Sequence, residues 1–157
     1  MTRTLFAVAL AALVACATAL AATAATTQDF DAQLHDNLVC PAGFDLCGKG
    51  VLQGYGTVTT TLRFTGFGPG PGNCAGLTAE RVITLDSDGS TLDLALDGVL
   101  CPKVSPNGHP SGSGTFTITG GTGIFAGATG SGLLSVQSTG VPVPSDTAHY
   151  HGTVTLP

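Results

Sequence analysis

The segment from Gly114 to Val136 joins two strand patterns through a connection that is too rich in glycine to form a helix. Residues Thr115 to Thr119 alternate, with Phe116 and Ile118 on one side and threonines on the other, which is the period-two pattern of a half-buried strand. Glycines then permit tight reversals before the sequence LLSV resumes a strand. The segment therefore predicts antiparallel β-structure.

One competing interpretation of this segment is a nucleotide site, because Gly121, Gly123 and Ala126 follow a strand and spell G-x-G-x-x-A. That motif requires a helix whose N-terminal amides face a pyrophosphate, and the sequence GATGSG is a very poor helix former. We therefore predict a hairpin or β-corner. The apolar pair Ile124 and Phe125, between two turns, is predicted to pack into the core.

The run GTFTITGGTGIFAGATGSG resembles the signature hairpin of the allene oxide cyclase and dirigent superfamily. In that family a strand ends in G-G-T-G, here residues 120–123, an aromatic residue follows, and G-A-x-G, here residues 127–130, leads into the next strand. The resemblance, to bacterial secreted members in particular, covers the mature chain. It implies an all-β fold, an antiparallel up-and-down, calycin-like β-barrel of about eight strands with a central cavity.

The N-terminal residues 1–25 read as a signal peptide, with Arg3 before an apolar core from Leu5 to Leu20 and small residues at the cleavage site. An alternative is a lipoprotein, because Leu13-Val14-Ala15-Cys16 fits a lipobox in which Cys16 is acylated. Residues 26–157 then form a single barrel domain. We predict a secreted, periplasmic or extracellular protein without a membrane span.

Charge excludes several classes of partner. Ten acidic residues outnumber five basic ones, and the net charge is −5. The basic residues are not clustered, so nucleic acid and anionic membrane surfaces are not expected partners. No pattern calls for a cofactor, and none is predicted; an oligomer is compatible with the sequence.

Strand patterns recur along the chain. Phe30 to Val39 predicts a first strand and His149 to Leu156 a last one. Between Tyr55 and Phe67, one face carries Val58, Thr60, Leu62 and Phe64. Leu77 to Leu85 and Thr91 to Leu100 predict a hairpin with a type I′ turn at Asp88-Gly89. Two long loops, Gly66 to Asn73 and Lys103 to Gly112, are then expected at the same end.

The predicted hairpin also indicates how the cysteines pair. Cys74 and Cys101 lie at similar distances from the centre of its turn and should meet across its open end. Four mature cysteines in an exported chain allow three pairings, and the hairpin favours Cys40–Cys47 with Cys74–Cys101. A four-cysteine zinc site is disfavoured because the short C-x2-C spacing is missing.

Charged side chains inside predicted strands are the candidates for ligand binding. A cavity lined by an arginine and a carboxylate would bind a polar or carboxylated ligand. The candidates are Arg63, Glu80 and Arg81, together with Tyr150 on the predicted buried side of the last strand. The alternative is that the charges form cross-strand pairs on the outer face. Glu80 is also the candidate catalytic carboxylate.

Two histidines form a candidate metal pair. His149 and His151 lie on one face of the last strand, the spacing with which H-x-H pairs chelate transition metals. A third ligand, from His35, His109 or Glu80, is not brought near by the sequence, and solvent-exposed histidines are the favoured interpretation. The sequence DSDGS resembles the start of a calcium loop, but a hairpin turn explains it better.

Three functions fit these patterns. The resemblance to dirigent proteins implies a secreted barrel that binds a small apolar or aromatic ligand without converting it. The resemblance to allene oxide cyclase implies an isomerase or cyclase, with the cavity folding a reactive substrate beside Glu80. The third possibility is an extracellular interaction protein that contacts a partner through its two Gly/Pro loops.

Overall fold

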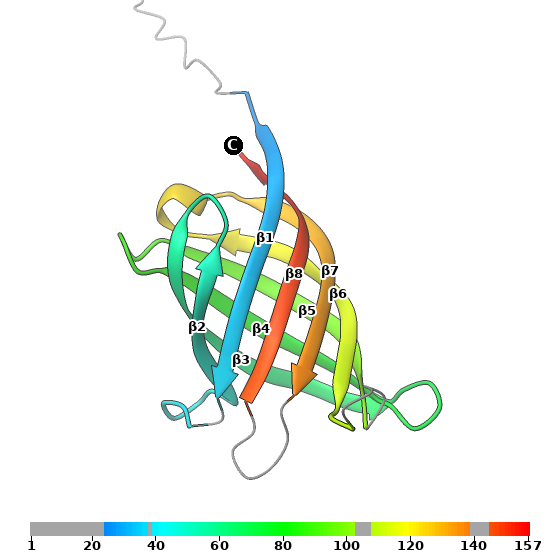
Figure 1. Ribbon diagram of the computed structural model, residues 1–157. Coiled ribbons are helices and arrows are strands. Elements are labelled where there is room, and N and C mark those ends of the chain that lie inside the picture. Colours follow the sequence, from blue (N-terminus) through cyan, green and yellow to red (C-terminus); the bar gives the residue numbers. More distant parts are fainter. Residues whose placement is uncertain (1–23, 38, 103–107, 139–144) are drawn as a thin grey trace, which may run out of the picture.

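The computed structural model describes residues 24–37, 39–102, 108–138 and 145–157, and these form an eight-stranded antiparallel barrel (Figure 1). The strands, with one single-turn 3-10 helix between the sixth and seventh, are β1 (Thr26–Asn37), β2 (Leu46–Leu52), β3 (Gly56–Pro69), β4 (Ala75–Leu85), β5 (Thr91–Cys101), β6 (Ser111–Gly121), η1 (Gly123–Phe125), β7 (Thr129–Ser138) and β8 (Ser145–Leu156). Each strand pairs with its sequence neighbour, and β1 pairs with β8 over its full length. The predicted all-β, up-and-down barrel is confirmed.

The alternation of the strands produces the core. On β3 the side chains of Val58, Thr60 and Leu62 are buried in the barrel, whereas Thr57, Thr59 and Arg63 face out. The same alternation holds on β5 and β6, where Leu92, Leu94, Leu96, Phe116 and Ile118 point inward as predicted. Because a closed barrel leaves no edge strand unpaired, every strand contributes one face to a single core.

The two ends of the barrel differ. At the end where β1 begins and β8 ends, η1 places Phe125 over the core, and its ring lies 4.9 Å from that of Tyr55. At the opposite end lie the end of β1 and the start of β2, the β3–β4 connection, and the ends of β5 and β7 with the starts of β6 and β8 (Figure 1). The prediction for the apolar pair in η1 was half right, because Phe125 is buried but Ile124 is 50% exposed.

Aromatic rings fill the middle of the barrel where the strands β7 and β8 carry glycine. Phe116 packs against Phe30 and Tyr150, with ring centroids 5.1 and 5.6 Å away. Gly132 and Gly152 face each other on the paired strands, and a Cβ at Gly132 would lie 2.6 Å from Phe116 Cε1 and 2.2 Å from the His151 carbonyl oxygen. The glycines therefore provide the room that the rings occupy.

Replacing Gly132 by alanine is expected to destabilise the barrel by about 1–3 kcal/mol, the usual cost of overpacking a filled core. The matched control is Gly68→Ala, because a Cβ there meets no atom within 4 Å and the backbone is not in the left-handed region. Urea denaturation of both variants measures the difference. Equal midpoints for Gly132→Ala and the wild type would contradict the close packing.

Several boundaries differ from the sequence predictions. Four residues, Asp86 to Gly89, separate the paired residues Leu85 and Ser90, so the β4–β5 turn is longer than the two-residue type I′ turn predicted. Strand β3 continues to Pro69 because a bulge after Phe64 keeps it paired with β4 through part of the predicted loop. Residues 1–23, including Cys16, and 103–107 of the second predicted loop lie outside the described residues.

The two predicted disulfides are present and join Cys40 to Cys47 and Cys74 to Cys101. The first joins the β1–β2 connection to β2, and the second joins the segment before β4 to the end of β5. Such bonds persist in an oxidising environment. Within the described ranges, no helix is long and apolar enough to cross a membrane.

Candidate functional site: a cavity above a buried ion pair

A cavity of ≈ 70 Å³ lies inside the barrel at the end opposite η1. Its lining includes Asp36 near the end of β1, Leu46 at the start of β2 and Asp146 near the start of β8, which places it at that end of the barrel. Most of its wall is apolar. The aliphatic and aromatic wall residues include Leu46, Leu62, Phe64, Leu77, Leu96, Leu134, Val136 and Ala148.

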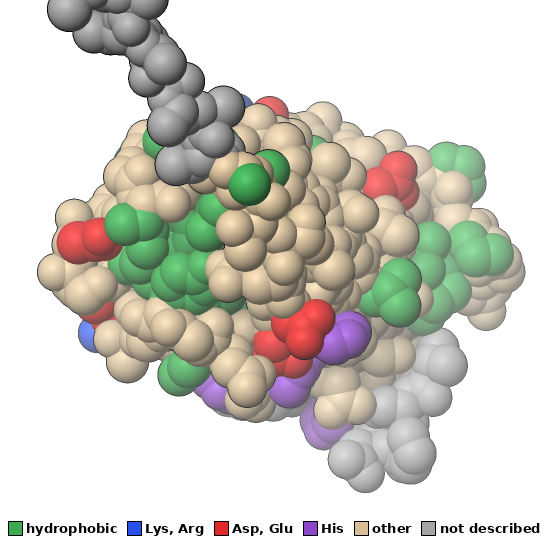
Figure 2. All heavy atoms as spheres, turned by 90° about the horizontal axis from the view of Figure 1, so that it is seen from above, with side chains coloured by type: hydrophobic (Ala, Val, Ile, Leu, Met, Phe, Trp, Pro, Cys, Tyr) green, Lys and Arg blue, Asp and Glu red, His purple; other side chains and the backbone are tan. Residues whose placement is uncertain are grey.

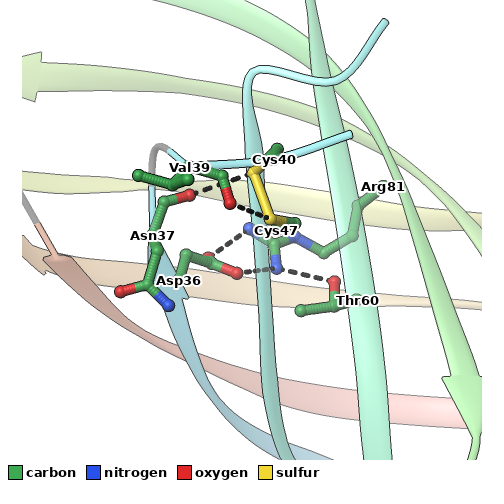
Figure 3. Close-up of a disulfide and its surroundings, with 7 residues drawn as sticks. All are labelled: Asp36, Asn37, Val39, Cys40, Cys47, Thr60 and Arg81. Carbon is green, nitrogen blue, oxygen red and sulfur yellow. Dashed lines mark hydrogen bonds and ion pairs between the residues drawn. A yellow bond between two sulfur atoms is a disulfide. The ribbon is translucent and has the colours of Figure 1, made fainter. Parts of the chain in front are cut away.

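A buried ion pair forms part of the same lining. Arg81 on β4 and Asp36 on β1 are 2% and 1% exposed. Arg81 Nη1 donates to Asp36 Oδ1 at 3.0 Å, and Nη2 donates to Oδ2 at 2.6 Å, so the contact is bidentate (Figure 3). Nη1 also donates to Thr60 Oγ1 of β3 at 2.9 Å. These side-chain hydrogen bonds connect β1, β3 and β4 inside the barrel.

The guanidinium group also lies near an aromatic ring. Arg81 Cζ is 5.5 Å from the centroid of Tyr150, which is the geometry of a cation–π contact. Burial raises the pKa of the Tyr150 phenol to about 12, so the hydroxyl stays protonated at neutral pH. Burial also acts to lower the pKa of Arg81, but contacts with Tyr150 and the carboxylates outweigh it, and the pKa of Arg81 is raised.

Asp146 is a second carboxyl group at the cavity. It is half-buried, and removal from water is the main cause that raises its pKa. Repulsion from Asp36 acts in the same direction, whereas a hydrogen bond with Ser138 and attraction to Arg81 act against it. The cavity thus brings one arginine and two carboxyl groups together in a largely apolar wall.

The structure separates the four residues proposed for ligand binding. Arg81 and Tyr150 line the cavity. Arg63 and Glu80 lie on the outer face of β3 and β4, where Arg63 Nη2 donates to Glu80 Oε2 at 2.8 Å and both side chains are 60% exposed. Glu80 therefore cannot act on a ligand in the cavity, and the cross-strand alternative describes this pair.

The two candidate metal ligands also lie outside. His149 and His151 are exposed on β8, and His151 Nδ1 lies 3.5 Å from Asp31 Oδ2 on β1. Figure 2 shows histidine and acidic side chains side by side on the surface. Among the described residues, no group of three or more His, Cys, Asp or Glu side chains is placed to hold a metal ion.

Sequence reasoning missed Asp36 and Asp146, which line the cavity, and Thr60, which accepts a hydrogen bond from Arg81. A signal existed for Asp36 and for Thr60. Asp36 continues the inward series that begins at Phe30, and Thr60 lies in the apolar series of β3. A polar residue at an inward position must find a partner. Asp36 and Thr60 could therefore have been predicted as hydrogen-bond partners of Arg81, which points inward from β4.

Comparison with known proteins identifies no family: no protein-family model matches the chain, and no curated protein matches it significantly.

Proposed function

We propose that this protein is a secreted binding protein that holds a small apolar ligand in the end of its barrel opposite η1 and does not convert it. The observation that carries the proposal is the apolar cavity at one end of the barrel. Its wall consists mainly of leucine, valine, phenylalanine and alanine, with a few fixed polar groups. That combination is typical of small-molecule sites, in which apolar contacts supply affinity and polar groups set orientation.

The size of the cavity limits the ligand. At ≈ 70 Å³ it is far smaller than the roughly 300–1,000 Å³ of pockets that enclose a drug-sized molecule. It is about twice the volume of roughly 30 Å³ that one water molecule takes up in the liquid. The ligand therefore enters end-on, with a few heavy atoms inside and the remainder at the mouth of the cavity.

The cavity supports binding better than catalysis. An isomerase or cyclase that uses acid–base chemistry needs a group able to exchange a proton with the substrate. Asp36 is held by both nitrogens of Arg81, and the Tyr150 phenol keeps its proton. Of these three cavity groups, that leaves Asp146, which is hydrogen-bonded with Ser138, as the candidate for proton transfer. The carboxylate first considered for this role, Glu80, lies on the outer face. For the alternative of an interaction surface, the described part of the first Gly/Pro loop offers the exposed aromatic side chain of Phe67, which is 71% exposed.

Export and family membership complete the proposal. The signal-peptide pattern of residues 1–25 and the two disulfides support passage into an oxidising compartment. The glycine-rich segment and the eight-stranded closed barrel support a relationship to the allene oxide cyclase and dirigent superfamily. Within that superfamily, the polar groups of the cavity favour a dirigent-like role, in which the ligand is bound but not converted, because Asp36 is paired with Arg81 and the Tyr150 phenol keeps its proton.

A pair of substitutions on β7 tests the site. Val136 lines the cavity and is half-buried, so Val136→Phe is expected to fill it and to weaken binding of the hydrocarbon 2-methylhex-1-ene at least tenfold. Leu133→Phe makes a similar change on the outer face, where Leu133 is 67% exposed, and should leave binding unchanged. Titration followed by the methyl NMR signals of Leu134 and Ala148 measures both affinities. Equal binding by Val136→Phe and the wild type would place the ligand elsewhere.

A further inference from the structure

We propose that the cavity selects neutral ligands that carry an oxygen acceptor, such as a carbonyl or hydroxyl oxygen, and that the Nε–H edge of Arg81 is the group that recognises this oxygen. The inference rests on the proposed function and adds the chemical class of the ligand. It is carried by a buried donor without a partner on a residue that lines the cavity.

The hydrogen bonds of Arg81 leave one edge of the guanidinium group unused. A guanidinium group has five N–H bonds in a rigid plane. Asp36 accepts from Nη1 and Nη2 at the end of the group, and Thr60 accepts from Nη1. Nε is buried and has no hydrogen-bond partner. The Nε–H bond shares an edge with the second N–H of Nη2, so this edge can donate two parallel hydrogen bonds to one ligand group.

Burial makes this unused edge a recognition element. A buried donor without a partner is costly, and a donor on a charged group more so. Arg81 is 2% exposed and lines the cavity, so a ligand oxygen that enters from the cavity and reaches Nε would remove that cost. A hydrocarbon of the same shape would leave the donor unpaired. Sites built to bond an oxygen reject analogues that lack it for this reason.

The charges around Arg81 favour a neutral acceptor over an anion. Asp36 already neutralises the guanidinium group through two hydrogen bonds. Asp146 adds a further carboxyl group at the same cavity, close enough to interact with both Arg81 and Asp36. A ligand carboxylate would therefore enter a site that holds two carboxyl groups and one cation. A ketone or alcohol brings the same oxygen without that repulsion.

Two neutral probes of one shape and one anionic probe test the inference on the unmodified protein. Hexan-2-one carries the acceptor, 2-methylhex-1-ene replaces the oxygen by a methylidene group, and hexanoate carries a charged acceptor. We expect hexan-2-one to bind about tenfold more tightly than the alkene, and hexanoate to bind more weakly than the ketone. The ¹⁵N–¹H signal of Arg81 Nε should shift with hexan-2-one and not with the alkene.

A variant provides a second readout. In Asp36→Leu/Arg81→Met the ion pair is replaced by apolar side chains, and the ketone-to-alkene affinity ratio should fall from about ten to about one. Equal affinities of the two neutral probes for the wild type, or an Nε signal that hexan-2-one does not move, would overturn the inference while leaving the proposed function intact. Tighter binding of hexanoate would overturn the preference for a neutral ligand. If none of the probes binds, the proposed function fails as well.

Discussion

Asp36→Ala is expected to lower the free energy of unfolding by about 3–5 kcal/mol, because it leaves the Arg81 guanidinium group buried without its counter-ion. Both nitrogens that Asp36 holds lose their acceptor, and Arg81 is too deeply buried to reach water without rearranging β4. Thr60 remains as a single neutral acceptor for Nη1. Thermal and urea denaturation measure the loss.

Two controls separate this effect from the loss of any charge. Glu80→Gln breaks the exposed pair with Arg63 and should cost about 0–1 kcal/mol, the range of surface ion pairs in water. Asp36→Leu/Arg81→Met removes both charges and should recover most of the stability lost by Asp36→Ala. If Asp36→Ala is no more damaging than Glu80→Gln, Arg81 is not confined as the structure shows.

Removing the disulfide Cys74–Cys101 by alanine substitution is expected to destabilise the protein by about 3.5 kcal/mol through the loop entropy of the unfolded chain. The bond spans a sequence separation of 27 residues, against 7 for Cys40–Cys47, whose removal should cost about 2.4 kcal/mol by the same relation. Denaturation of the two double variants under oxidising conditions measures the order.

The opposite order of the two disulfide variants would show that the shorter bond acts on the native state. Cys47 pairs with Asn37 in the β1–β2 register, next to Asp36, so strain or loosening there would reach the ion pair (Figure 3). In that case loss of Cys40–Cys47 should also change ligand binding. Under the loop-entropy account, binding by the folded protein stays unchanged.

The fold was predictable because its determinants are local. The inward series of β3, β5 and β6 could be assigned from alternation alone, and the hairpin from β4 to β5 fixed the disulfide between Cys74 and Cys101. The errors lie where local patterns compete. The β4–β5 turn contains Asp-Gly but has four residues, and Ile124 is exposed because η1 turns only one side of its single turn toward the core.

The site was harder to predict because it depends on contacts between distant strands. Arg63 and Arg81 both lie in strands; alternation places Arg63 on the outer face of β3, but only the register of β3 against β4 shows that it faces Glu80 there. The partner of Arg81 is Asp36, 45 residues away in sequence. Local spacing cannot indicate such a pair. The alternation rule does indicate that both side chains point inward, and that is the part of the site a sequence can reveal.

The central claim is that the barrel holds a small apolar ligand in the cavity beside Arg81 and Tyr150, and a structure of the protein with bound hexan-2-one tests it most directly. We expect the ligand between Leu62, Leu134 and Ala148, with its oxygen at the Nε–H edge of Arg81. A ligand bound only on the outer face of the strands, or a cavity closed by side chains at saturating ligand, would contradict it.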